Sequence, residues 1–170
     1  MLGALDPVRD APAVFNAARN GEFLRFISWA PPASCEEVQA RLQTWADATG
    51  PMQSLVLSVR NAITQDWVSF VRLMPADPAL GFGNAVEGGL CVHPRYWNSG
   101  IGTQLSRFVV TNLFAVSPTT AVVARVAVGN LGCRAMLRAA GFQEEGFTRL
   151  KAETGVEHNA VVLVLRHPLA

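Results

Sequence analysis

The order of strand-like and helix-like segments limits the possible folds of this chain more than any other feature. Helical patterns fill most of the first sixty residues. Two antiparallel strands are expected next, at 54–60 and 67–74, around a turn at 61–65. Beyond a loop at 75–84, strands are expected at 86–93, 122–128, 142 onward and 159–166. Helices are expected between them at 100–113 and 130–140. This order predicts an α/β protein with a mixed central sheet and helices on both faces.

Local signals mark the ends and the faces of these elements. Ser34 and Glu37 form a capping box at the start of one helix, and the glycine-proline pair at 50–51 is expected to end it. The run 161–165 is apolar without alternation, which indicates a strand covered on both faces. Residues expected to share an apolar face are Leu55, Leu57 and Val59 in the first strand, and Ile101, Leu105, Phe108, Val109 and Leu113 in the 100–113 helix.

The composition is that of a folded protein without marked charge. Half of the 170 residues are apolar and 16% are charged, which excludes a disordered chain. No linker divides the chain, so one domain over 1–170 is expected. The net charge is +1 without a basic run, which argues against nucleic acid or a membrane surface as partner.

The cysteines and histidines show no spacing typical of metal ligands, so no metal is expected. Cys35, Cys91 and Cys133 are odd in number, which favours free thiols in a reducing, cytoplasmic setting. No stretch is apolar over the length needed to cross a bilayer.

The segment from Val92 to Leu105 carries the strongest chemical signal. A strand ends near His93, a short loop follows, and a helix begins at Gly100 and Gly102. Backbone N–H groups at the start of a helix bind anions, and such a loop suits a pyrophosphate. Two alternatives remain: the glycines serve tight packing, or the loop binds a dinucleotide. The second is weaker, because Leu105 stands where the third glycine of that motif belongs.

A second segment begins at Asn130, directly after a strand, and ends at Gly141-Phe142. The Asn130 side chain either caps the following helix or reaches a ligand amide, and both roles are compatible.

Together the two segments resemble GNAT-type N-acetyltransferases, in the branch that includes the ribosomal-protein-alanine N-acetyltransferases. That family's coenzyme A loop is matched by 97–102, with Trp97 at its first place and Tyr96 before it. Its later motif is matched by Asn130, Cys133, Leu137, Gly141 and Phe142, with cysteine in place of serine. The resemblance is clear from about residue 54 onward. It is weaker before that, where only residues 2–5 fit the family's first strand, so this strand is expected to be short or missing.

The resemblance implies acetyl-CoA as co-substrate and direct attack of an amine on its thioester. It implies that the end of the 86–93 strand pairs with the pantetheine arm, that the glycine loop holds the pyrophosphate, and that a residue at the next strand's end contacts the arm. The residues assigned to these roles are Leu90, Cys91 and Val92 for the strand, Trp97, Asn98, Ser99, Gly100, Ile101, Gly102 and Thr103 for the loop, and Asn130 for the arm.

Two residues are candidates for proton transfer. An attacking amine must lose a proton, and Glu87 is the candidate base, because it lies on the strand that leads to the loop and the family often has an acid there. The alternative is an exposed strand carboxylate. The tyrosine that many relatives use to protonate the leaving thiolate is replaced by Leu137. Cys133 is therefore either the acid or a small residue that fills space beside the sulfur.

The acceptor is expected to be a small-molecule amine or a protein N-terminus. The alternative is a non-catalytic module that binds coenzyme A or another protein on the same fold. A homodimer is possible, because the composition is apolar and leaves little polar surface.

Overall fold

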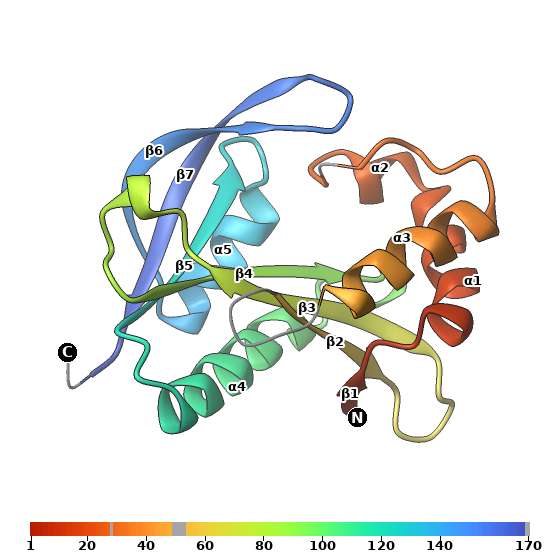
Figure 1. The fold of residues 1–170 in the computed structure, drawn as a ribbon, viewed down its shortest axis with the longest axis horizontal. Helices are drawn as coiled ribbons and strands as arrows, with labels where there is room; N and C mark the ends of the chain where they lie inside the picture. The colour runs from red at the N-terminus through yellow and green to blue at the C-terminus, as the bar shows by residue number, and fades with distance from the viewer. Residues whose placement is uncertain (28, 49–53, 169–170) are drawn as a thin grey trace.

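A computed structural model describes residues 1–27, 29–48 and 54–168 (Figure 1). The expected elements are all present. They are β1 Leu2–Ala4, α1 Pro7–Ala18, α2 Gly21–Leu24, α3 Cys35–Asp47, β2 Leu55–Arg60, β3 Trp67–Pro75, η1 Pro78–Leu80, β4 Ala85–Val92, η2 Pro94–Tyr96, α4 Ile101–Val116, β5 Ala121–Ala127, α5 Leu131–Ala140, β6 Gln143–Lys151 and β7 Glu157–Arg166. The pair at 50–51, expected to end α3, lies outside the described residues.

The strands form one mixed sheet in the order β1-β2-β3-β4-β5-β7-β6. Neighbouring strands are antiparallel except β4 and β5, which are parallel. That pair is short: Ala85–Glu87 lie opposite Ala121–Val123, and beyond this the two strands part. The parting leaves backbone groups of β4 without a strand partner in the middle of the sheet, where a ligand can satisfy them.

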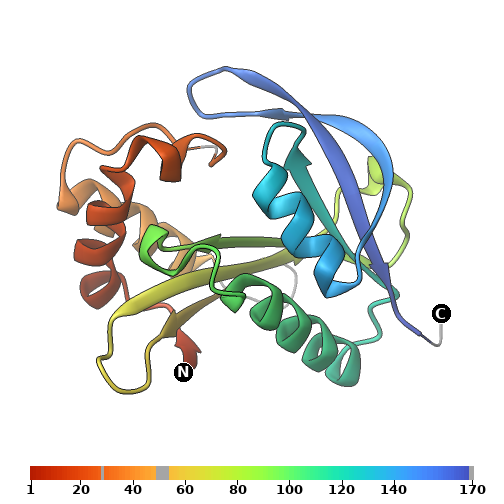
Figure 2. The ribbon, with the colours of Figure 1, turned by 180° about the vertical axis from the view of Figure 1, so that it is seen from behind.

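Helices cover both faces of the sheet, as predicted. In Figure 1, α3 lies in front of the sheet with α1 beside it, and Figure 2 shows α4 and α5 on the opposite face. The first pair packs on Trp67 and Phe70 of β3. On the other face, α4 packs on β3 and β4, and α5 packs on β5 and β7. Each face therefore has its own apolar core.

The first strand is short, as expected, and it forms one edge of the sheet. Its three residues pair with β2, and the backbones of Met1 and Arg60 exchange hydrogen bonds of 2.6 and 2.8 Å. Buried charges hold the same corner together: Arg60 forms an ion pair with Asp10 of α1, whose side chain is completely buried. The N-terminus is thereby joined to the first helix and the second strand.

Two expected faces need correction. In β2, Leu57 and Val59 do lie together toward α4, but the more deeply buried face holds Val56, Ser58 and Arg60. The alternation of the sequence predicted that the apolar side of β2 would be the buried one. The side with Ser58 and Arg60 can be buried against α1 because Arg60 forms an ion pair with Asp10. In α4, which runs three residues further than expected, Phe108 is 53% exposed and Val110 is buried instead.

Candidate functional site

A cavity of about 540 Å³ lies where β4 and β5 part. The end of β4, the loop after it, and α5 form most of its wall, and residues of and after α2 complete it. Nine of the eleven residues predicted to bind the cofactor line it: Leu90, Cys91, Val92, Trp97, Asn98, Gly100, Gly102, Thr103 and Asn130. Ser99 and Ile101 do not. Ser99 instead donates a hydrogen bond of 2.6 Å to the Tyr96 carbonyl and shapes the loop.

The loop at 97–103 leaves the start of α4 open to a ligand. Gly100 is the N-cap residue, with a φ of 80° that favours glycine, and no side chain caps the helix. The first internal bond runs from the Gln104 N–H to the Gly100 carbonyl, at 3.1 Å. The N–H groups of Ile101 to Thr103 therefore remain available beside the cavity, at the positive end of a long helix.

Gly102 has a packing role beside its place in the cavity wall. A Cβ added there would overlap the Met136 sulfur, so α4 and α5 approach each other closely at this point. Tight packing, one of the alternatives raised from the sequence, therefore accounts for glycine at 102. At 100, glycine is favoured by the positive φ of the backbone.

Trp97 fastens the loop to the strand before it. Its indole Nε1–H donates a hydrogen bond of 2.7 Å to the Val92 carbonyl, while 42% of the residue remains exposed. At the first position of the coenzyme A motif, the uncharged Trp97 ring thus holds the loop against the end of β4.

Asn130 caps α5, as one of its two expected roles requires. Its Oδ1 accepts a hydrogen bond of 3.1 Å from the Cys133 N–H. The residue also lines the cavity, and its Nδ2 has no hydrogen-bond partner among the described residues. The amide group is held by the cap and can still donate to a ligand carbonyl.

Glu87 does not line the cavity, and it is not an exposed strand carboxylate either. It is only 8% exposed, and both its oxygens accept hydrogen bonds from Arg125 of β5, at 2.8 and 3.0 Å. Arg125 borders a second, smaller cavity of about 190 Å³, which continues from Leu90 and Asn130 between the parted strands. Arg125 is therefore at the edge of the site, and Glu87, which lines neither cavity, is connected to it through Arg125.

Two thiols face the cavity, and both have raised pKa values. Burial raises the pKa of Cys91 to about 12 and that of Cys133 to about 11. Both are protonated at neutral pH, so neither is a nucleophilic thiolate. His93 lies on the other side of the loop, where burial and then Arg95 lower its pKa.

The sequence analysis missed the apolar wall from the N-terminal part of the chain. Phe23, Phe26 and Ile27 line the cavity, and Phe26 and Ile27 line the second cavity as well. The only available signal was a cluster of apolar residues after a four-residue helix. That these apolar residues line the same cavity as α5 follows only from the tertiary fold.

The fold is that of the GNAT class, a mixed sheet that parts between parallel strands at a cavity. A family model of the acetyltransferase (GNAT) domain matches residues 3–143. The chain therefore belongs to the GNAT acetyltransferase family. No curated protein matches it in sequence.

Solved structures agree with this fold. A GNAT-family acetyltransferase from Bacillus anthracis has a TM-score of 0.79 and 13% identity, over 97% of this chain and 93% of that one. Spermidine N-acetyltransferase from Vibrio cholerae, in complex with CoA and spermine, has a TM-score of 0.76 and 17% identity, over 98% and 94%. Ribosomal-protein-S5-alanine acetyltransferase from Vibrio fischeri has a TM-score of 0.74 and 16% identity, over 98% and 92%. At these identities the likeness shows the fold.

Within the described ranges, no group of three or more acidic, histidine or cysteine side chains is placed to hold a metal ion. The same ranges contain no helix that is long and apolar enough to cross a membrane.

Proposed function

We propose that this protein transfers an acyl group, acetyl in the simplest case, from acyl-CoA to a primary amine by direct attack. The cavity carries the proposal, because it brings together the open end of β4, the free N–H groups of α4 and the Asn130 amide. Bound acyl-CoA supplies an activated thioester. The residues of this chain hold its phosphates at the helix start and its arm along β4.

Glu87 remains the candidate for accepting the amine proton. The bidentate pair with Arg125 fixes the carboxylate beside the second cavity, and each oxygen keeps a lone pair for an amine or a bridging water. Cys133 is better suited to filling space than to acid catalysis. A thiol whose pKa lies above the value of about 8.5 for a free thiol releases its proton unfavourably to a leaving thiolate.

The first test is the melting temperature with acetyl-CoA, coenzyme A and NAD at equal concentrations. At about 100 times its Kd, a ligand stabilises the folded state by about 2.7 kcal/mol. We expect a rise of several degrees with both coenzyme A forms and none with NAD. No rise with either form would remove the basis of the proposal.

Turnover separates the roles of Glu87 and Cys133. We expect Glu87→Gln to lower kcat by about 100-fold, within the usual range for general base catalysis. Cys133→Ala should change kcat less than about threefold. An unchanged Glu87→Gln rate would assign Glu87 to structure alone.

A non-catalytic coenzyme A-binding module is the second candidate. It is favoured by one observation, that Arg125 already engages both oxygens of Glu87. Binding without turnover of any amine would support it. The ribosomal-protein-alanine branch, a homodimer and one domain over 1–170 remain predictions, as does a reducing, cytoplasmic setting, which rests on the three free cysteines.

A further inference from the structure

Arg72 of β3 is a half-buried cation that has no anionic partner among the described residues. All fourteen Lys and Arg residues are described, and the side chains of three of them, Arg19, Arg72 and Lys151, have no hydrogen bond or ion pair to any described residue. Arg19 and Lys151 are exposed to water, but Arg72 is not. Its Nε is sealed from solvent and has no hydrogen-bond partner. The guanidinium contacts Trp45 of α3, whose ring centre lies 5.3 Å from the guanidinium carbon.

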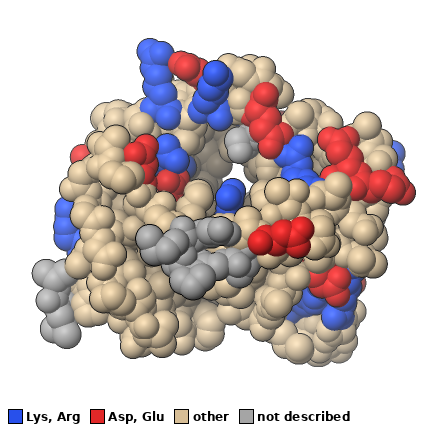
Figure 3. All heavy atoms as spheres, viewed as in Figure 1, with Lys and Arg blue, Asp and Glu red and all other residues tan. Residues whose placement is uncertain are grey.

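The position of Arg72 connects it with the proposed site. Arg72 lies opposite Gly89 of β4, and the next pair on the same face of the sheet is Met74 with Glu87. Gly89 is exposed and borders the second cavity, together with Arg125. Figure 3 shows a hollow on this face, between the two halves of the molecule, with Lys or Arg atoms visible inside it. The open position above Gly89 thus lies between the free guanidinium and the Glu87–Arg125 pair.

The charges in this region favour an anionic ligand. The other arginines that are at least partly buried are neutralised: Arg60 by Asp10, Arg125 by Glu87, Arg41 by Glu153 and Arg134 by Glu144. A half-buried charge without a counter-ion is costly, and a sealed donor without a partner is rare in folded proteins. None of the residues outside the described ranges, 28, 49–53 and 169–170, has an acidic side chain that could supply the missing anion. A guanidinium offers a planar fork of donors that matches a carboxylate or a phosphate.

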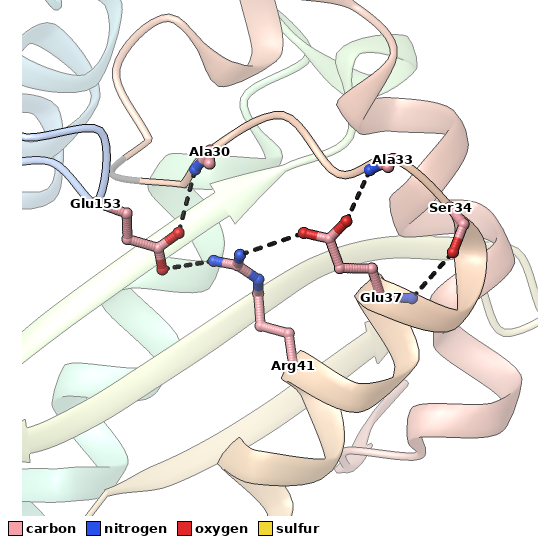
Figure 4. Close-up of polar contacts among 6 residues, drawn as sticks. All are labelled: Ala30, Ala33, Ser34, Glu37, Arg41 and Glu153. Atoms are coloured by element: carbon pink, nitrogen blue, oxygen red, sulfur yellow. Dashed lines mark hydrogen bonds and ion pairs between the residues drawn. The ribbon is translucent and has the colours of Figure 1, made fainter.

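The hollow is bridged along one side. Glu153, at the tip of the β6–β7 hairpin, accepts hydrogen bonds from Arg41 of α3 at 2.5 Å and from the Ala30 N–H at 3.1 Å (Figure 4). This contact joins two segments from opposite sides of the site, as Figure 1 shows for the hairpin and α3. The bridge favours a small acceptor over a folded protein chain.

We propose that the acceptor is a small amine that also carries an oxyanion, a carboxylate or a phosphate, which Arg72 binds while the amine faces the acyl group. This rests on the proposed acyl transfer and names the class of its acceptor. It disfavours polyamines, because their amines would face an unneutralised arginine. The same guanidinium would repel a second positive charge and attract a negative one.

Matched acceptors test the proposal. Release of coenzyme A would be followed with the twenty common amino acids, their amides, phosphoethanolamine, ethanolamine and spermidine. We expect an anionic acceptor to exceed its neutral counterpart in kcat/KM by about tenfold or more, the size of one charge-assisted hydrogen bond. Comparing the amino acids with phosphoethanolamine shows whether the site prefers a carboxylate or a phosphate. Equal or better use of amides, ethanolamine or spermidine would overturn the inference.

A second measurement does not depend on knowing the acceptor. The Arg72 Nε–H signal would be titrated by NMR with acetate, inorganic phosphate and, as control, chloride. A saturable shift with acetate or phosphate beyond that of chloride is expected. A signal that responds to none of them would contradict the assignment even if no acceptor were found. The coenzyme A-induced rise in melting temperature is measured separately, so its absence would refute acyl transfer rather than the anion site.

Variants separate binding from packing. Arg72→Met keeps the apolar stem against Trp45, and we expect it to raise KM about tenfold for the anionic acceptor, with kcat and the KM of the amide little changed. Arg72→Lys should restore part of the affinity, because it keeps the charge without the fork. Arg19→Met removes an exposed charge and serves as the matched control. An equal loss for all amines, together with a lower melting temperature, would make Arg72 structural and overturn the inference.

Discussion

At the scale of single residues, burial and hydrogen bonding change the reactivity of side chains in ways that the sequence does not show. Cys133 occupies the position where the resemblance to the family motif implies serine, and burial on α5 beside the cavity raises the pKa of its thiol to about 11. Glu87 was assigned from its place on a strand, yet both its oxygens accept hydrogen bonds from Arg125, 38 residues away. A chemical role assigned from a position in the sequence therefore also depends on which residues surround that position in the folded protein.

The raised pKa of Cys133 predicts its reactivity. Alkylation proceeds through the thiolate, so the rate at Cys133 should still be rising about tenfold per pH unit from pH 8 to pH 10. A free thiol instead approaches its plateau near pH 8.5 to 9.5. Iodoacetamide labelling followed by peptide mass spectrometry would measure this, with the urea-unfolded chain as control. A plateau near pH 9 in the folded protein would contradict the raised pKa.

At the scale of elements, a buried ion pair joins α1 to β2. Desolvation raises the pKa of Asp10 above its usual value, against the opposing effects of the Asp6 N–H and Arg60. A raised pKa in the folded state means that the stabilisation by protonated Asp10 is complete below pH 3.8 and is lost as the pH rises through the folded-state pKa. At neutral pH the carboxylate therefore depends on Arg60.

Removing the cation should be costly. We expect Arg60→Met to lower the free energy of unfolding by about 3–5 kcal/mol at pH 7, because it leaves a buried charge uncompensated. The loss should shrink as the pH falls toward 4, where Asp10 takes up a proton. The double variant Asp10→Asn with Arg60→Met should recover much of the stability. Urea unfolding at pH 7 and pH 5 measures these differences, and a pH-independent loss would argue that Arg60 acts by packing alone.

At the scale of the whole molecule, the hairpin bridge closes one side of the site. The hydrogen bond from Arg41 is the main cause that lowers the pKa of Glu153, with smaller contributions from the Ala30 N–H and the Arg41 charge. A lowered carboxylate pKa stabilises the fold above pH 4.5, and this contribution is lost as the pH falls through the folded-state value. Glu153 is half exposed, so the effect on global stability is small.

Breaking this bridge should affect motion more than stability. We expect Glu153→Gln to lower the free energy of unfolding by less than about 1 kcal/mol, but to speed hydrogen exchange at the hairpin tip, 152–156, several-fold. Glu157→Gln is the matched control, because Glu157 pairs with Arg149 inside the hairpin and not across the site. Unchanged exchange in Glu153→Gln would show that apolar packing alone holds the hairpin.

The sequence by itself determined the elements and the cofactor motifs. Turn residues, caps and apolar spacing are local, so the helix at 35–47 and the loop around Gly100 could be predicted from a few neighbouring residues. The two motifs had the right spacing, and nine of the eleven assigned residues line one cavity. The Gly100 conformation follows from a local rule, because glycine adopts a positive φ at little cost.

Only the tertiary structure decided what surrounds those motifs. The parting of β4 and β5, the wall at Phe26 and the bridge from Glu153 to Arg41 join segments far apart in the sequence. Burial and charge pairing depend on such distant neighbours. No local pattern therefore shows that Glu87 has an ionic partner, whereas Arg72 has none among the described residues. That difference between two charges on one face of the sheet is the basis on which we propose an acceptor with an oxyanion.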